Sequence, residues 1–144
     1  MNVLFFLTPK SEVAYLMDDW TLRQGIEKLE HSGYTAIPMI DRQGRYIGVV
    51  TEGDFLWTLK KRYDMNLKEA ENVSILTVER RTDFKPVSID ASMEDLIQTA
   101  MNQNFVPVID DKKIFIGIVT RKDIIRFCYD TYVKNKTEER KDGA

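Results

Sequence analysis

The stretch YIGVVTEGD at residues 46–54 returns as FIGIVTRKD at residues 115–123, which is 69 positions later. The stretch IPMID at residues 37–41 returns at the same spacing as VPVID at residues 106–110. Eight of the seventeen positions from Pro38 to Asp54 are identical in the second copy. Similarity of this length at one fixed spacing indicates an internal duplication.

Each copy predicts the same order of elements. Thr21 with Gln24, and Ser92 with Asp95, are typical of a capping box that opens a helix. A short apolar strand, a turn and a second apolar strand follow, and another helix is expected to begin at Thr51 or Thr120. Short strands are also expected at residues 13–16 and 85–89. The fold class is therefore α/β (α+β), with two pseudo-symmetric β-α-β-β-α repeats packed as one module.

The repeats suggest a division of the chain into four parts. Residues 8–66 form the first repeat and residues 81–133 the second. Residues 67–80 are expected to hold a linking helix, over 67–76, and a linker. Residues 134–144 are a charged tail that we expect to fray.

Composition excludes several classes of function. The formal net charge is −2 and the pI is about 5.5, so nothing favours nucleic acid, whose affinity depends on lysine and arginine at phosphates. No stretch is long and apolar enough for a membrane span. Cys128, the only cysteine and an expected core residue, excludes an internal disulfide, and a cytoplasmic protein is the interpretation. The basic runs at residues 60–62 and 80–81 are interpreted as solvated faces.

Residue types for catalysis are also missing from the pattern. His31 is the only histidine, so no histidine–cysteine cluster suits zinc. Neither a Walker loop nor a Gly-x-Gly-x-x-Gly stretch occurs, and no nucleophile–base pair can be named. We expect no enzyme activity, no metal and no catalytic cofactor.

The motif Gly-h-h-Thr-x-x-Asp, where h is apolar, occurs twice and resembles the cystathionine-β-synthase (CBS) domain family. The likeness covers residues 11–132 and includes the helix, the proline-containing strand and the glycine strand of both copies. It implies a tandem pair around a pseudo-two-fold axis, with two clefts between the sheets and association as a homodimer. It further implies an adenine nucleotide as ligand and a protein partner, acting in trans, that responds to its binding.

A narrower likeness exists to small stand-alone CBS-pair proteins of bacteria that sense cyclic di-AMP. It lies in SEVAY at residues 11–15, GYTAIP at 33–38 and FIGIVTR at 115–121. It implies that Tyr34, Thr35, Ala36 and Arg121 contribute to the ligand site. The family likeness also implies that the base lies at strand edges, which here are Val13, Ala14, Tyr34, Thr35, Ala36, Phe105 and Val106. For Tyr34 and Phe105 the alternative is packing in the core.

The two Thr-x-x-Asp turns allow two compatible interpretations. Thr51 with Asp54, and Thr120 with Asp123, have the spacing of a helix cap. A helix start also offers free amides to phosphate, and a carboxylate in its first turn can accept ribose hydroxyls. The sequence does not choose between Asp54 and Asp123 for the ribose.

The copies differ between the threonine and the aspartate. The first copy has Glu52 and Gly53, whereas the second has Arg121 and Lys122, whose cations suit phosphate. The hypothesis is one principal site with the phosphate at Arg121 and Lys122. The alternative is that both are solvated helix charges.

The leading interpretation is a regulatory sensor of AMP, ATP or cyclic di-AMP, which the sequence does not distinguish. The first alternative is a structural dimerisation module with vestigial nucleotide sites. The others are a small enzyme acting on a nucleotide and, more remotely, a nucleic-acid binder.

Overall fold

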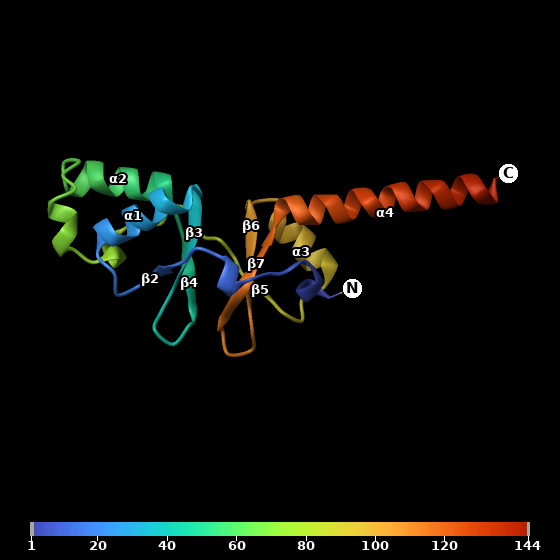
Figure 1. Cartoon of the computed structure of the whole chain (residues 1–144), viewed down its shortest axis with the longest axis horizontal. Coiled ribbons are helices and arrows are strands. Elements are labelled where there is room, and N and C mark those ends of the chain that lie inside the picture. Colours follow the sequence, from blue (N-terminus) through green and yellow to red (C-terminus); the bar gives the residue numbers. More distant parts are fainter. Residues whose placement is uncertain (1, 144) are drawn as a thin grey trace.

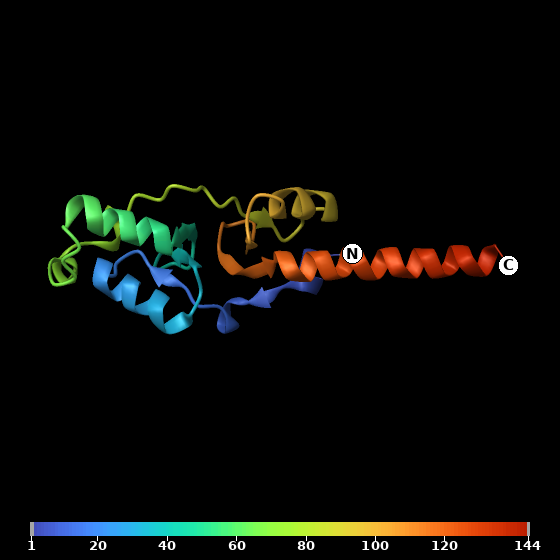
Figure 2. The ribbon, with the colours of Figure 1, turned by 90° about the horizontal axis from the view of Figure 1, so that it is seen from above.

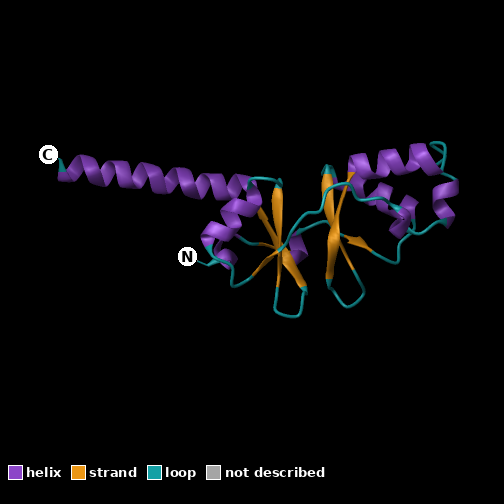
Figure 3. Cartoon of the chain, turned by 180° about the vertical axis from the view of Figure 1, so that it is seen from behind, coloured by secondary structure: helices purple, strands orange, loops and turns teal. Residues whose placement is uncertain are grey.

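The computed structural model describes residues 2–143 and has two β-sheets that face each other, with helices on their outer sides (Figures 1 and 3). The first sheet has the order β2 (Leu16–Met17), β3 (Ala36–Ile40), β4 (Tyr46–Thr51). The second has the order β1 (Thr8–Pro9), β7 (Phe115–Thr120), β6 (Phe105–Ile109), β5 (Val87–Ser88). The predicted fold class is confirmed.

The helices divide between the repeats in the same way. The α-helices are α1 (Leu22–Ser32), α2 (Glu52–Arg62), α3 (Met93–Ala100) and α4 (Arg121–Asp142). Four 3₁₀ turns complete the chain: η1 (Val3–Phe6), η2 (Lys10–Glu12), η3 (Glu69–Asn72) and η4 (Ile75–Thr77). Helices α1 and α2 cover the first sheet, and α3 and the first turns of α4 cover the second (Figure 1).

Strand register repeats the duplication seen in the sequence. β2 runs parallel to β3 and β5 parallel to β6, while β3–β4 and β6–β7 are antiparallel. Pro38 lies opposite Val49 in the first hairpin, and Pro107 lies opposite Ile118 in the second. Each repeat buries its own core between sheet and helices, and a third cluster of Val49, Phe84 and Phe105 lies between the sheets.

The two repeats exchange their leading segments. β1 lies at the N-terminal end of the first repeat but pairs with β7 of the second, with Thr8 opposite Ile118. The segment before β5 makes the equivalent crossing, since Nη1 of Arg80 donates to the Ile47 carbonyl of β4 at 3.3 Å. Figure 2 shows the two connecting segments on opposite sides of the molecule. This double crossing joins the repeats into one unit.

The sequence-based prediction about the connection between the repeats is wrong. Residues 67–76 form the turns η3 and η4 instead of a linking helix. The Leu22 amide donates to the Val73 carbonyl and the Ile75 amide to the Trp20 carbonyl, so this backbone is used in pairing with the start of α1. The segment is therefore bound in a form that a helix could not adopt.

The charged tail does not fray, because α4 continues through it to Asp142. Residues 134–142 contain several strong helix formers and no glycine or proline before Gly143. Cys128 lies on an outer face of this helix and is exposed, so its predicted place in the core is also wrong.

The helix caps are confirmed in part. Thr21 and Gln24 form both hydrogen bonds of a capping box. At Ser92 only the hydroxyl is used, and it accepts from the Asp95 amide at 3.1 Å. The cap of α3 is therefore the weaker form of the predicted motif.

Gly117 is predicted to be required for the crossing of β1. Its φ is 153°, and an added Cβ would overlap the Thr8 carbonyl oxygen and press on Leu7 and Pro9. Gly117→Ala should lower the free energy of unfolding by about 2 kcal/mol or more, because backbone atoms cannot move aside cheaply. Gly48→Ala is the matched control, since its Cβ meets only the flexible guanidinium of Arg80, and it should cost about 1 kcal/mol. Urea denaturation of both variants measures the difference, and equal losses would contradict this role of Gly117.

Candidate functional site

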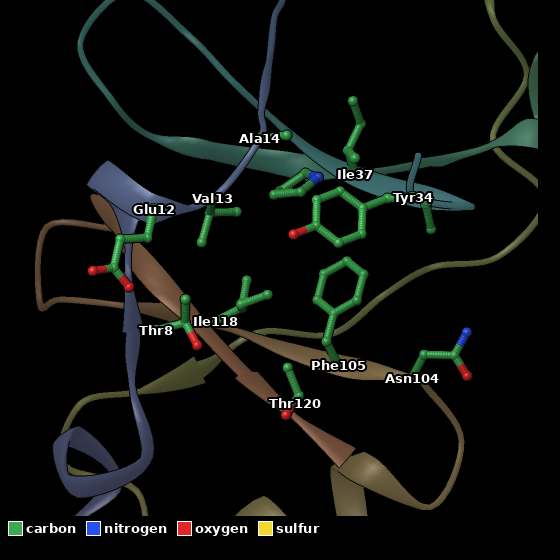
Figure 4. Close-up of a pocket in the computed structure, with 12 residues that line it drawn as sticks. Thr8, Glu12, Val13, Ala14, Tyr34, Ile37, Asn104, Phe105, Ile118 and Thr120 are labelled. Carbon is green, nitrogen blue, oxygen red and sulfur yellow. The ribbon is translucent and has the colours of Figure 1, made fainter. Parts of the chain in front are cut away.

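A cavity of about 220 Å³ lies between the two sheets, beside the crossing N-terminal segment (Figure 4). Its walls come from the N-terminal segment, from the start of β3, from the start of β6 and from β7. The lining residues are Thr8, Glu12, Val13, Ala14, Tyr34, Ala36, Ile37, Pro38, Asn104, Phe105, Ile118 and Thr120.

Two aromatic rings face this space from different repeats (Figure 4). Tyr34 follows Gly33, which ends α1 in the left-handed conformation with φ of 71°. The Tyr34 amide donates to the Ser32 hydroxyl at 3.2 Å, and the Tyr34 side chain remains 57% exposed at the mouth. Phe105 begins β6 and is buried. A flat group could therefore enter between an outer ring and an inner one.

The cavity wall is mostly apolar. Val13, Ala14, Ala36 and Ile118 add aliphatic surface to the two rings, and Glu12 is the one charged side chain among the lining residues. A pocket with an apolar body and few polar groups at its edge suits an uncharged planar group. It does not suit a phosphate, which carries negative charge.

The equivalent space on the other side of the pseudo-two-fold axis is filled. Phe84 stands where the first repeat has Val13, and its ring lies 5.3 Å from that of Phe105. Gln103 stands where the first repeat has Tyr34, and it is buried. Its amide nitrogen donates to the carbonyls of Lys85 and Phe105 at 2.9 and 3.1 Å, and its oxygen accepts from the Lys85 amide at 2.9 Å.

Tyr46 closes the filled side further. Its hydroxyl donates to the Phe84 carbonyl at 2.5 Å. Burial raises the pKa of Tyr46 well above its ordinary value, so the hydroxyl stays protonated and keeps this bond. The duplication has therefore left one side open and one side sealed by side chains.

Six of the predicted site residues line the cavity: Val13, Ala14, Tyr34, Ala36, Phe105 and Thr120. Thr35 is exposed beside it, with its carbonyl bound to the Glu52 amide. Val106 alternates to the opposite face of β6 and is fully buried in the core of the second repeat, so its side chain does not reach the cavity.

The first Thr-x-x-Asp turn has a structural role. Thr51 Oγ1 accepts from the Asp54 amide at 3.1 Å, and Asp54 Oδ2 accepts from the Thr51 amide at 2.9 Å. Asp54 Oδ1 accepts from the Arg81 amide at 3.1 Å, and the side chain is 2% exposed. Both carboxylate oxygens are committed to backbone amides, so Asp54 is not presented to a ribose.

The second turn keeps only half of the cap. Thr120 Oγ1 accepts from the Asp123 amide at 3.2 Å, but the Asp123 carboxylate has no hydrogen-bond partner among residues 2–143. It lies in a neighbouring groove with Arg126 and Asp130. Lys122 is exposed and does not line the cavity.

Arg121 points away from the cavity. Its Nε donates to the Ala100 carbonyl at 2.8 Å, and Nη2 lies 3.5 Å from the Met101 carbonyl. The guanidinium therefore caps the end of α3, where carbonyls lack helical partners. The guanidinium is held by backbone carbonyls at the end of α3, and its contact with a phosphate stays a prediction.

Sequence reasoning missed Thr8, Glu12, Asn104, Ile37, Pro38 and Ile118, which also line the cavity. Thr8 and Glu12 reach it because β1 crosses to the second sheet, which no local pattern reveals. Ile118 and Thr120 share one face of β7 by strand alternation, so Thr120 could have indicated Ile118.

The different roles of the two aspartates predict different costs of substitution. Asp54→Asn cannot accept from both amides, so it should lower the free energy of unfolding by about 1–3 kcal/mol. Asp123→Asn should cost about 0.5 kcal/mol, the loss of a favourable charge at the start of α4. Thermal and urea denaturation of the two variants measure this. An Asp123 variant as unstable as the Asp54 variant would contradict the assignment.

The part of the chain from 2 to 143 holds no group of three or more metal-ligating side chains. Across the same residues no helix combines the length and apolar composition needed to cross a membrane.

Comparison with known proteins gives a consistent family. The chain is 26% identical over 123 residues to the Cyclic di-AMP receptor B of Bacillus subtilis, covering 84% of this chain and 82% of that protein. A structure of CbpB in complex with c-di-AMP superposes with a TM-score of 0.82 at 22% identity, covering 96% of this chain and 91% of that one. A structure of CBSX2 in complex with AMP gives 0.71 at 21% identity, covering 91% and 98%. Both structural likenesses concern the fold.

Some relatives are far longer than this chain. It is 30% identical over 90 residues to the L-aspartate semialdehyde sulfurtransferase of Methanocaldococcus jannaschii and spans 16% of that protein. The family model for the CBS domain matches twice, at residues 7–61 and 77–130. The chain therefore belongs to the CBS domain family and carries two CBS domains in tandem.

Proposed function

We propose that the chain is a regulatory sensor that binds an adenine nucleotide, AMP, ATP or cyclic di-AMP, and catalyses no reaction. The observation that carries this proposal is the apolar cavity between the two sheets, open on one side of the pseudo-axis only. The relatives support it, since one is named a cyclic di-AMP receptor and two similar folds hold c-di-AMP and AMP.

The size of the cavity supports a base as the buried part. Pockets for whole drug-sized ligands hold roughly 300–1,000 Å³, and this cavity holds about 220 Å³. The base would enter between Tyr34 and Phe105, and the sugar and phosphate would lie outside.

The sealed side indicates which base fits the open side. The side-chain amide of Gln103 presents an NH2 donor and a neighbouring oxygen acceptor to the backbone of Lys85 and Phe105. In the first repeat Ala14 corresponds to Lys85 and Ala36 to Phe105. Tyr34 replaces Gln103 there, so no side-chain amide binds the backbone of these two alanines.

Backbone direction at Ala36 supports this equivalence. The Thr35 carbonyl binds the Glu52 amide, as the Asn104 carbonyl binds the Arg121 amide. In an antiparallel pair the next residue then turns its amide and carbonyl away from the partner strand. Ala36 therefore offers its carbonyl toward the cavity side, as Phe105 offers its own to Gln103.

Adenine reproduces the pattern of the Gln103 amide, because its exocyclic amine donates beside a ring-nitrogen acceptor. The amine would donate to the carbonyls of Ala14 and Ala36, and the ring nitrogen would accept from the Ala14 amide. Guanine has an oxygen in place of that amine, which would face carbonyl oxygens.

AMP should therefore bind at least about tenfold more tightly than GMP, since a carbonyl without a donor costs about 1–3 kcal/mol. Isothermal titration of the purified chain with both nucleotides measures this, and the same comparison applies to cyclic di-AMP against cyclic di-GMP. Equal affinity for the adenine and guanine forms would contradict recognition by the backbone of Ala14 and Ala36.

Tyr34→Ala should weaken adenine-nucleotide binding by about fivefold to a hundredfold, because stacking of a base on an aromatic ring contributes roughly 1–3 kcal/mol. Tyr34 is exposed, so stability should change little. Tyr129→Ala is the matched control, since Tyr129 is an exposed tyrosine on α4. Unchanged affinity in the Tyr34 variant would place the base elsewhere.

A homodimer and a protein partner in trans belong to the same proposal. Leu56 and Ile125 occupy equivalent positions in the two repeats, and both are exposed, at 44% and 59%. An apolar side chain left uncovered twice at one position supports a partner surface across the pair. Sedimentation velocity of the chain and of a Leu56→Glu, Ile125→Glu variant tests the dimer.

The alternative, a structural dimerisation module with vestigial sites, is favoured by the sealed side of the interface, where Phe84 and Gln103 occupy the space. A thermal-shift panel of AMP, ATP and cyclic di-AMP separates the two functions. No stabilisation by any of them would support the alternative.

A further inference from the structure

Two grooves adjoin the cavity through shared lining residues. One groove of about 370 Å³ shares Thr8 with the cavity and runs along the first turns of α4. The other, of about 360 Å³, shares Glu12, Val13, Ala14 and Tyr34 with it and runs along the last turns of α1. Because the cavity fits a base alone, we expect the phosphate in a groove that adjoins it, and this step depends on the proposed function.

Charge separates the two grooves. The α4 groove contains the carboxylates of Asp123 and Asp130 against the single guanidinium of Arg126. The α1 groove contains the ammonium group of Lys28 against the single carboxylate of Glu12, and the imidazole of His31 lines it as well. A phosphate is repelled by a surplus of carboxylates and attracted by an ammonium group, so the α1 groove is the favourable one.

The start of α4 is also occupied in other ways. The Arg121 amide binds the Asn104 carbonyl, and the Asp123 amide binds the Thr120 hydroxyl. The Arg121 guanidinium binds the end of α3. Amides that already have partners, next to a carboxylate, make a poor phosphate site.

Lys28 is available for a ligand. Among residues 2–143 it has no carboxylate within ion-pair distance, while its neighbour Glu27 is bound to Arg23 at 3.0 Å. Lys28 and His31 are three residues apart and so lie on one face of α1. Glu30 is exposed on the same helix but does not line the groove.

Two hydrogen bonds make the end of α1 less unfavourable for an anion nearby. Helix carbonyls at a C-terminus carry partial negative charge. Here the Ser32 hydroxyl and the Gly33 amide both donate to the Leu29 carbonyl, which reduces that charge. The Ser11 hydroxyl lines the same groove and adds a donor.

We propose that Lys28 and His31, with Ser11, form the subsite for the phosphate of the bound nucleotide, on the outer side of Tyr34. The chemical class is a phosphate mono- or diester attached to an adenosine whose base lies in the cavity. Tyr34 then separates the two parts of the ligand, with the base on one side and the anion on the other.

The test compares charged and uncharged probes on the full chain. Isothermal titration of Lys28→Ala, His31→Ala with AMP, ATP and cyclic di-AMP should show affinity reduced by about tenfold or more for the probe that binds wild type, because charge-assisted hydrogen bonds are lost. Adenosine should bind wild type and variant within about twofold. Raising the salt concentration should weaken nucleotide binding to wild type more than to the variant.

Two further variants make the result specific. Lys134→Ala, Lys141→Ala removes the same number of side chains from the exposed far end of α4 and should leave nucleotide affinity unchanged. Arg126→Ala tests the other groove, since Arg126 is the cation that lines it. If the Arg126 variant loses phosphate-dependent affinity while the α1 variant keeps it, the subsite is at α4 and the proposal is overturned.

The failure of the subsite and the failure of the proposed function give different results. Wild type that binds AMP, with an α1 variant that binds it equally well, overturns the subsite alone. Wild type that binds neither adenosine nor any of the three nucleotides overturns both.

Discussion

The exchange of leading segments between the repeats is the constraint on which the rest of the structure depends. β1 adds to the second sheet only because Gly117 has no side chain to meet the Thr8 carbonyl. The segment around Arg80 crosses to the first sheet beside Gly48 in the same way. These crossings bring the two sheets face to face, and the cavity exists because the N-terminal segment passes over its edge.

Divergence of the two copies has given this symmetric frame a single opening. Val13 is small and Tyr34 lies exposed at the mouth, which leaves room, whereas Phe84 and Gln103 at the equivalent positions fill it. The register of the two hairpins is the same, so the difference arises in the side chains and connecting segments around them. On one side the chain fills the space with its own glutamine.

Much of the fold follows from the sequence, because it depends on local patterns. The duplication, the order of elements and the helix starts at Thr21, Thr51 and Thr120 can be predicted from spacing and capping. Six site residues could be named from the family likeness, and they are those on strand edges at the junction of the sheets. The path of residues 67–76 could not be predicted, because its backbone is hydrogen-bonded to a segment distant in the sequence, at Trp20 and Leu22.

The roles of individual charged side chains also could not be predicted from the sequence pattern. Asp54 and Asp123 are the same residue in the same motif, yet only Asp54 accepts from a backbone amide of a crossing segment, that of Arg81. The sequence suggested that the Arg121 side chain is available to a phosphate, but it donates to the Ala100 carbonyl at the end of α3. Lys28 and His31 belong to a groove that forms only when α1 is placed beside residues 11–14.

Helix α4 connects the cavity wall with a distant part of the surface. The helix has 22 residues, which corresponds to about 33 Å, and all side chains of its outer half are exposed. Thr120 is both its cap and part of the cavity wall. A tilt of about 10° at Thr120 would carry the far end of the helix through about 6 Å, so a small change at the cavity wall would be enlarged at a surface outside the body of the protein.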